Sequence, residues 1–255
     1  MTADEFSLIC GKLRPFTDYL YFHVMGEPLL HPDLERFLEI AAGYGFRVCI
    51  TTNGTLLRER GEVLLKHSGA VHKVSISLHS MEGNGAEEEL ADYLMTAVTF
   101  AQKAAAAGIH TVFRLWNLDA EGKNGENREN QRIESFLHEQ FPGEWGKRWN
   151  GLRLAKSIFL EYAGIFTWPS ESDAEAVEDG YCHGLTDQIA VLADGTVVPC
   201  CLDSEGEIAL GNLLREETEE ILRSPRATAM REGFCQGRMT EPLCRTCTYA
   251  RRFKK

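Results

Sequence analysis

Six of the eight cysteines lie between Cys182 and Cys247. Two of them, Cys244 and Cys247, stand in the sequence "CRTC", which places two thiolates within chelating reach around one turn of chain. Cys200 ends a segment that reads as a hairpin strand, where its thiolate can meet the other two. In a reducing compartment, clustered cysteines indicate metal ligation before disulfides. We therefore predict a metal site formed by Cys182, Cys200, Cys244 and Cys247.

The metal is not fixed by the ligand type, because four thiolates can hold either tetrahedral zinc or an iron-sulfur cubane. Zinc ribbons usually have two C-x-x-C pairs, and this chain has one, which favours the cluster but leaves zinc open. Cys200 and Cys201 point to opposite faces in extended backbone, so we expect only one of them to be a ligand. Cys235 is either a fifth candidate or a plain thiol. Cys10 and Cys49 occupy apolar positions and are expected in the core.

A second group of polar residues stands at the ends of apolar segments in the first half of the chain. Glu27 follows a strand-like segment directly, within Gly26-Glu27-Pro28, and Asn53, Ser77 and Arg114 stand at or near the ends of later ones. Each has a structural explanation from the residues alone. Glu27 could cap a helix, and Ser77 could satisfy a strand-end amide. Asn53 could belong to a turn, and Arg114 could form a structural pair.

The segments that carry these residues alternate in type. A helix over residues 2–13, with Thr2 and Glu5 as a capping box, comes first. Helical patterns then follow strand patterns, as in parallel sheets and barrels with helices outside. Five strands are predicted, at residues 18–24, 46–52, 71–80, 110–118 and 152–162. Helices are predicted at about 33–43, 56–67, 87–108 and 130–141.

The pattern changes after an acidic, small-residue stretch at about 170–180, where we place a linker. Residues 188–201 read as two strands around an Asp194-Gly195 turn, which is a hairpin signal. One more helix is predicted over residues 213–223, before the cysteine-rich end. We expect two domains, at residues 1–169 and 170–255.

Composition narrows the classes of partner. The formal net charge of −11 disfavours a general affinity for nucleic acid or anionic membrane. No apolar run approaches the roughly 20 residues that span a bilayer, and the N-terminus lacks the order of a secretory signal. We expect a cytoplasmic protein that binds neither nucleic acid nor membrane.

Taken in order, these motifs resemble those of the S-adenosylmethionine (SAM) radical enzymes. The resemblance is carried by Gly26-Glu27-Pro28 after one strand, "TTNG" after the next and "SISLH" after the third. The pattern C-x12-G-x4-C followed by C-x-x-C, from Cys182 to Cys247, is similar to the auxiliary-cluster extension called SPASM or twitch. The resemblance covers nearly the whole chain.

The resemblance implies a fold and a set of cofactor contacts. The fold would be a partial TIM-like (β/α) barrel without its first strand, followed by the small cysteine-rich domain. Glu27 would accept from the ammonium of SAM, Ser77 would reach its carboxylate or ribose, and Arg114 would pair with a carboxylate of cofactor or substrate. The implied cofactor-binding residues are Gly26, Glu27, Pro28, Thr52, Asn53, Ser77 and Arg114.

The implied cofactors are SAM and one auxiliary [4Fe-4S] cluster, since no cysteine follows Cys247 to build a second auxiliary cluster. A reductant such as flavodoxin or ferredoxin and a peptide or small-molecule substrate are the implied partners. The sequence does not identify the substrate. The loop 119–130 and the aromatic residues Phe166 and Trp168 are candidates for shaping its pocket.

One part of the family pattern is missing. Family members carry C-x3-C-x2-C after the first strand, and those thiolates bind the cluster that cleaves SAM; this sequence has no such motif. The missing strand and the missing motif would be the same segment. The explanations are a truncated or mis-assigned start, completion by another polypeptide, or loss of radical chemistry, and we expect the first.

Three functions follow from these observations. The first is a radical SAM oxidoreductase or maturase, in which a 5′-deoxyadenosyl radical abstracts hydrogen from the substrate. The second is a non-catalytic iron-sulfur or electron-transfer module, and the third a zinc-stabilised structural protein.

Overall fold

The computed structural model describes residues 1–81, 87–118, 128–164, 168–169 and 174–253. They form two compact units: Thr17–Ile165 is the sheet unit, and Met1–Phe16 with Phe166–Lys255 is the cysteine unit. The predicted boundary near residue 170 stays a prediction. No helix in the described residues is both long and apolar enough to cross a membrane.

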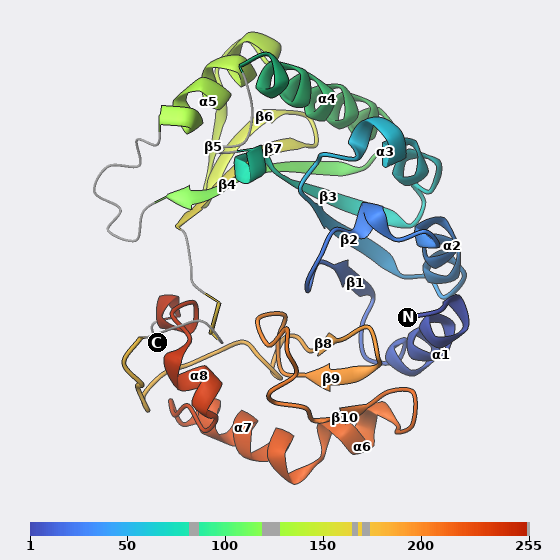
Figure 1. Ribbon diagram of the computed structural model, residues 1–255, viewed down its shortest axis with the longest axis vertical. Helices are drawn as coiled ribbons and strands as arrows, with labels where there is room; N and C mark the ends of the chain where they lie inside the picture. The colour runs from blue at the N-terminus through green and yellow to red at the C-terminus, as the bar shows by residue number, and fades with distance from the viewer. Residues whose placement is uncertain (82–86, 119–127, 165–167, 170–173, 254–255) are drawn as a thin grey trace. The chain divides into compact units, whose positions relative to one another are not determined.

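The sheet unit contains a seven-stranded sheet in the order β1-β2-β3-β4-β7-β6-β5. Its first five strands in that order are parallel, and β6 and β5 continue it antiparallel. Helices α2 to α5 run along the sheet (Figure 1). The strands are β1 (Tyr19–Phe22), β2 (Arg47–Thr52), β3 (Val71–Ser77), β4 (His110–Leu118), β5 (Gly146–Arg148), β6 (Gly151–Ala155) and β7 (Ile158–Gly164). The helices are α2 (Leu34–Gly43), α3 (Leu57–Lys66), α4 (Glu87–Ala106) and α5 (Arg128–Gln140), with 3-10 turns η1 (Pro28–Leu30) and η2 (Leu78–Met81).

Alternation along the strands separates an apolar face from a polar one. Val74, Ile76 and Phe113 have no exposed surface and belong to the apolar core. On the opposite face, Ser77 of β3 lies beside Arg114 of β4 in the sheet register. Thr51, Ser77 and Arg114, near the ends of β2, β3 and β4, therefore lie on one face of the sheet.

The mixed α/β fold with a parallel sheet confirms the predicted fold class, but the fifth strand was predicted wrongly as one strand over 152–162. The structure has two antiparallel strands there, β6 and β7, joined at Ser157, whose φ of 62° reverses the chain. A Cβ at Gly151 would lie 2.0 Å from the carbonyl oxygen of Leu160, so the hairpin requires glycine at that position. β7 supplies the fifth parallel strand.

The cysteine unit contains a three-stranded antiparallel sheet, β8 (Ala190–Val191), β9 (Thr196–Val198) and β10 (Gly211–Asn212). The predicted Asp194-Gly195 hairpin is confirmed: Gly195 has φ of +85°, and its amide donates to the Leu192 carbonyl at 2.9 Å. Its helices are α1 (Ala3–Leu13), α6 (Thr218–Leu222), α7 (Pro225–Cys235) and α8 (Pro242–Thr246), with a 3-10 turn η4 (Ala250–Arg252).

The capping box of α1 is confirmed, with Thr2 and Glu5 bonded reciprocally at 2.7 and 3.3 Å. This helix belongs to the cysteine unit. The Lys12 ammonium donates to the Glu216 carbonyl at 2.8 Å, and the Thr218 hydroxyl donates to the Lys12 carbonyl at 3.0 Å. These contacts fasten α1 to the start of α6.

The single helix predicted over 213–223 was wrong. The Asn212 side chain accepts from the Leu214 amide at 2.9 Å and holds a turn, so α6 begins only at Thr218. α7 was missed, although Ser224 caps it and Pro225 occupies its first turn, which is a recognisable helix start.

Candidate functional site

Glu27 joins the end of β1 to the end of β2. One carboxylate oxygen accepts from the Leu29 amide at 3.0 Å and caps η1, and the other accepts from the Asn53 amide at 2.7 Å. Gly26, before it, has φ of +81° and no protein atom within 4 Å of where a Cβ would be. Each carboxylate oxygen keeps a lone pair. Glu27 therefore has a structural role and can still accept from an ammonium group.

The turn after β2 is tightly built. The Thr52 hydroxyl is buried and accepts from the Gly54 amide at 3.0 Å, and the Asn53 side chain accepts from the Thr55 amide at 2.9 Å. Gly54 has φ of +80°, and a Cβ there would lie 2.9 Å from the Tyr93 hydroxyl. The buried Thr52 hydroxyl thus stabilises the turn, and these hydrogen bonds fix the backbone around Asn53.

Tyr93, on α4, connects the ends of two strands. Its hydroxyl lies 2.7 Å from the carbonyl oxygen of Asn53 and 3.2 Å from that of Ser77. Burial, with a smaller effect from the Glu27 charge, raises the pKa of Tyr93, so the hydroxyl stays a neutral donor. The ends of β2 and β3 are therefore held together by one buried side chain.

Arg114 is placed over the same edge by β4. Its guanidinium stacks on the Trp116 ring at 4.1 Å and donates to the Thr51 hydroxyl at 3.4 Å. The His79 ring nitrogen Nδ1 lies 3.3 Å from the Arg114 carbonyl oxygen and 3.4 Å from the Trp116 amide, which ties η2 to β4. A cation thus stands beside the Ser77 position, as carboxylate recognition requires.

His23, just after β1, feels the same cation. Burial, then the charges of Arg114 and Lys73, lower the pKa of His23 to about 4. Arg114 and Lys73 are the cations that act on His23. The His23 imidazole is therefore neutral near pH 7, and Arg114 remains the cation beside the Ser77 position.

The four predicted cysteines are gathered within the cysteine unit. Their charges act on one another in all six pairings, which requires four neighbouring sulfur atoms. They come from three segments: Cys182 precedes the hairpin, Cys200 follows β9, and Cys244 and Cys247 belong to α8 and its C-cap. Cys201 acts on Cys200.

Burial is the largest cause raising the pKa of each of these thiols, to about 12 for Cys200. Backbone amides oppose burial: the Gly184 amide donates to the Cys182 sulfur at 3.4 Å. A Cβ at Gly184 would lie 3.2 Å from the Pro199 carbonyl oxygen, so glycine allows Cys182 and Cys200 to approach. Buried thiolates with amide donors are the donor set of an iron-sulfur or zinc site.

The spacing of the sulfur atoms bears on which metal fits. Thiolates about 2.3 Å from one tetrahedral zinc ion lie about 3.8 Å from one another. No three cysteine sulfurs in the described residues lie within 4.8 Å of one another, so the free thiols are not preset at zinc spacing. Four cysteine thiols are a donor set for either zinc or an iron-sulfur cluster.

Elsewhere in the described residues, one set of three side chains does meet that spacing: Glu35, Glu39 and His67, at the surface. Both carboxylates are already paired, Glu35 with Lys66 and Glu39 with Arg36. These ion pairs explain the cluster without a metal.

Two domain models match the sequence. A model of the radical SAM superfamily matches residues 2–123, and a model of the SPASM iron-sulfur cluster-binding domain matches residues 182–248. The chain belongs to the radical SAM superfamily and carries a SPASM domain. The SPASM match includes all four gathered cysteines.

Solved structures share the fold of this radical SAM protein. BtrN in complex with AdoMet and 2-DOIA is 19% identical, with a TM-score of 0.58 over 97% of this chain and 80% of that one. Native anSMEcpe with bound AdoMet is 13% identical, with a TM-score of 0.58 over 97% and 78%. Streptococcus suis SuiB bound to precursor peptide SuiA is 12% identical, with a TM-score of 0.51 over 97% and 64%. A search of curated proteins found no match.

Sequence reasoning missed three residues at the strand ends of the sheet unit: Thr51, Tyr93 and His23. Thr51 could have been found, because alternation along "RVCITT" puts Thr51 and Thr52 on opposite faces. Tyr93 carries no sequence signal, since only the packing of α4 brings it to two strand ends. The loop 119–130 lies almost entirely outside the described residues, as does Phe166; Trp168 is half-buried.

Proposed function

We propose that this chain is the main part of a radical SAM oxidoreductase or maturase that uses one auxiliary [4Fe-4S] cluster. The proposed cluster ligands are Cys182, Cys200, Cys244 and Cys247. SAM would lie at the carboxyl ends of the parallel strands, as ligands do in barrels of this kind. The substrate would be a peptide or a small molecule, the two kinds named with SuiB and BtrN.

The observation that carries the proposal is the gathering of four cysteine thiols, one buried and three half-buried, from three distant segments of the chain. Each buried thiolate would be costly without a metal to balance its charge. A cluster would supply that balance, and the amide donated by Gly184 would support the Cys182 sulfur.

At the strand ends, the protein's own residues would bind and orient SAM. Glu27, already fixed by two amides, would accept from its ammonium group without reorganising. Arg114 would pair with a carboxylate, and Ser77 would lie beside it in the register. Gly26, Pro28, Thr52 and Asn53 would shape the backbone around them.

When bound and reductively cleaved, SAM would supply a radical able to take a hydrogen atom from the substrate. The four cysteines would hold a cluster able to accept an electron from the substrate or to ligate it. SAM cleavage requires three further thiolates, which we expect in a C-x3-C-x2-C segment encoded upstream of residue 1 or on another polypeptide. The reductant would be a flavodoxin or ferredoxin, and the location the cytoplasm.

Anaerobic purification with metal and sulfide analysis tests the cluster. We expect about four irons and matching sulfide per chain from the cysteine unit alone. One zinc and no sulfide would instead select the zinc-stabilised structural protein.

The catalytic part is tested by extending the chain with its natural upstream sequence and measuring 5′-deoxyadenosine formed from SAM. We expect product only with the C-x3-C-x2-C segment present. A full cluster with no 5′-deoxyadenosine from the extended chain would leave the electron-transfer module as the function.

A further inference from the structure

A row of four polar side chains crosses the sheet unit on the face opposite its apolar core. The register of the parallel strands pairs Tyr21 of β1 with Cys49 of β2. It then pairs Cys49 with Lys73 of β3, and Lys73 with His110 of β4. Register partners in parallel strands project to the same face. A phenol, a thiol, an ammonium and an imidazole therefore lie side by side, and we call these four residues the cross-strand row.

The side chains of the cross-strand row act on one another. Those of Tyr21 and Cys49 are hydrogen-bonded to each other. Burial raises the pKa of Cys49, whereas the charge of Lys73 lowers it, so the ammonium lies near this sulfur. Burial, then the charges of Arg114 and Lys73, lower the pKa of His23 on the same sheet. The charged groups that act on His23 are thus both cations.

Lys73 is half-buried and lacks a counter-charge. Its ammonium forms neither an ion pair nor a hydrogen bond with any residue that the structure describes. The Nδ1 atom of His110, its neighbour in the row, is buried and also has no hydrogen-bond partner among those residues. Two adjacent groups that can donate to an anion are therefore unsatisfied within the protein, which is unfavourable for buried polar groups.

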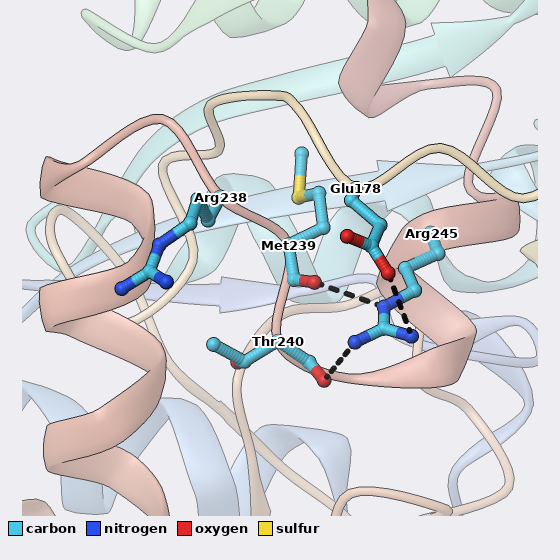
Figure 2. A pocket seen from close by; sticks show the side chains of 5 residues that line it. All are labelled: Glu178, Arg238, Met239, Thr240 and Arg245. Carbon is cyan, nitrogen blue, oxygen red and sulfur yellow. Dashed lines mark hydrogen bonds and ion pairs between the residues drawn. The ribbon is translucent and has the colours of Figure 1, made fainter.

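Other cations of the chain show the usual arrangement. In the cysteine unit, the Arg245 guanidinium donates to two backbone carbonyl oxygens, at 3.0 and 3.4 Å, and lies 3.8 Å from the Glu178 carboxylate (Figure 2). The small pocket of about 170 Å³ that these two residues line is thus closed by contacts within the protein. On α4, Lys103 pairs with Glu62 at 2.7 Å. Lys73 differs from both cations because its charge is not balanced by a carboxylate.

We propose that Lys73 and His110 form a subsite that binds a carboxylate group of the substrate, with the Cys49 thiol beside them. The inference rests on the proposed function and narrows its substrate to an acid. The Lys73 ammonium would donate to one carboxylate oxygen and balance its charge. His110, in the tautomer that carries its proton on Nδ1, would donate to the other oxygen.

The charge and position of the row favour a substrate carboxylate over a phosphate or SAM. One ammonium balances the single charge of a carboxylate, whereas a phosphate dianion requires a second cation. Ser77, which is expected to reach SAM, lies four residues further along β3, or about 13 Å at about 3.3 Å per residue. The cross-strand row is therefore separate from the strand ends at which SAM is proposed to bind.

The test is a titration of this chain, labelled with ¹³C-histidine, with acetate at constant pH and ionic strength, followed by the imidazole signals in NMR spectra. His110→Gln identifies the His110 signal. We expect acetate to shift that signal saturably, and acetamide, its neutral analogue, to leave it unchanged. Lys73→Met should weaken acetate binding about tenfold or more, because it removes the charge. Lys73→Arg keeps the charge and should stay within about fivefold of wild type.

The matched control removes a lysine from the other face of the sheet unit. Lys103→Met changes an exposed lysine on α4, and solvent screening should keep its acetate affinity within about twofold of wild type. Lys73→Gln covers the case in which methionine disturbs the packing, and it should also lose binding. No saturable shift in wild type, or equal affinity in wild type and Lys73→Met, would overturn the subsite. Lys73 would then be a lysine that extends its ammonium into solvent.

Two further measurements separate the other ligands. SAM affinity of Lys73→Met should stay within about twofold of wild type, because the sites are far apart; a tenfold loss would overturn the proposal in favour of a SAM contact. Inorganic phosphate that bound about tenfold more tightly than acetate would overturn it in favour of a phosphorylated substrate. Acetate binding requires no cluster, so protein without iron would contradict the proposed function alone, and the two failures are distinguishable.

Discussion

The two candidate sites are built by opposite means. At the strand ends of the sheet unit, the key groups already have hydrogen-bond partners within the protein. The Glu27 carboxylate accepts hydrogen bonds from two backbone amides, and the Tyr93 hydroxyl lies within hydrogen-bonding distance of two carbonyl oxygens. In the cysteine unit, burial raises the pKa of all four thiols, and their charges oppose one another. The groups of the first site are held by hydrogen bonds within the protein before a ligand arrives, whereas the thiols of the second must lose their protons when a metal binds.

The difference has a physical origin. Parallel strands bring residues from β2, β3 and β4 to one edge through regular hydrogen bonds, so this edge is positioned by secondary structure. The cysteine site depends on turns that bring together three segments far apart in sequence, and on glycines such as Gly184 that permit close approach. Loss of a ligand should consequently damage the second site far more than the first.

The largest effect is expected from Cys200→Ser. It removes one of four mutually close thiolates, and we expect loss of most iron and sulfide and a lower melting temperature of the cysteine unit. Cys201→Ser is the matched control, one residue away, and should keep the cluster. Metal analysis and visible absorbance of anaerobically purified protein measure both; equal losses from the two variants would contradict the assignment of Cys200.

Glu27→Gln tests the strand-end site, where Glu27 is hydrogen-bonded to two backbone amides. Glutamine keeps one acceptor oxygen and no charge, so one of the two amide bonds is lost and an ammonium loses its ionic partner. We expect SAM affinity to fall tenfold or more, with a loss of about 1–2 kcal/mol in the free energy of unfolding. Equilibrium dialysis and urea unfolding measure these. A stability loss with unchanged affinity would show that Glu27 serves only the fold.

Tyr93→Phe removes the hydroxyl that bridges two strand ends but touches no predicted ligand group. We expect about 1 kcal/mol lower stability and about a threefold weaker SAM affinity, because the Asn53 turn is less well held. Tyr162→Phe is the control, since the Tyr162 hydroxyl donates to Glu134 at 3.0 Å on α5. It should cost similar stability and leave SAM affinity unchanged; equal effects of both variants on affinity would rule out a positioning role for Tyr93.

The sequence predicted local features best. The Thr2/Glu5 capping box, the Asp194-Gly195 hairpin and the alternation of strands and helices are each decided by residues close in sequence, and each is confirmed. The β6–β7 hairpin was missed because its turn, at Lys156-Ser157, contains no Gly, Asn or Asp, the residues that most often adopt a positive φ.

The sites divide in the same way. "CRTC" and the residues after each strand are visible in the sequence, so the right regions could be named. The sequence does not reveal that Glu27 already holds Asn53, that Thr52 faces inward while Thr51 meets Arg114, or that Tyr93 joins two strands. Those facts depend on packing between segments that only the folded chain brings together.

A further effect concerns the acid sensitivity of the sheet unit. The folded-state pKa of His23 lies near 4, below its ordinary value of 6.5, because burial and then Arg114 and Lys73 disfavour the charged imidazole. Below pH 6.5 the unfolded state binds this proton and the folded state does not, so the stability present above that pH is lost as pH falls towards 4.

We expect the free energy of unfolding to fall by on the order of 2 kcal/mol from this residue over that window. His23→Gln should remove that part of the slope, because glutamine does not titrate. His31→Gln is the control: His31 stands at the end of η1, where its Nδ1 accepts from the Asp33 amide at 3.1 Å. Urea unfolding at pH 7 and pH 5 measures the slopes. If His23→Gln kept the wild-type dependence of stability on pH, the lowered pKa of His23 would be contradicted. The charge of Arg114 would then not act on a neutral imidazole at this edge before a ligand binds.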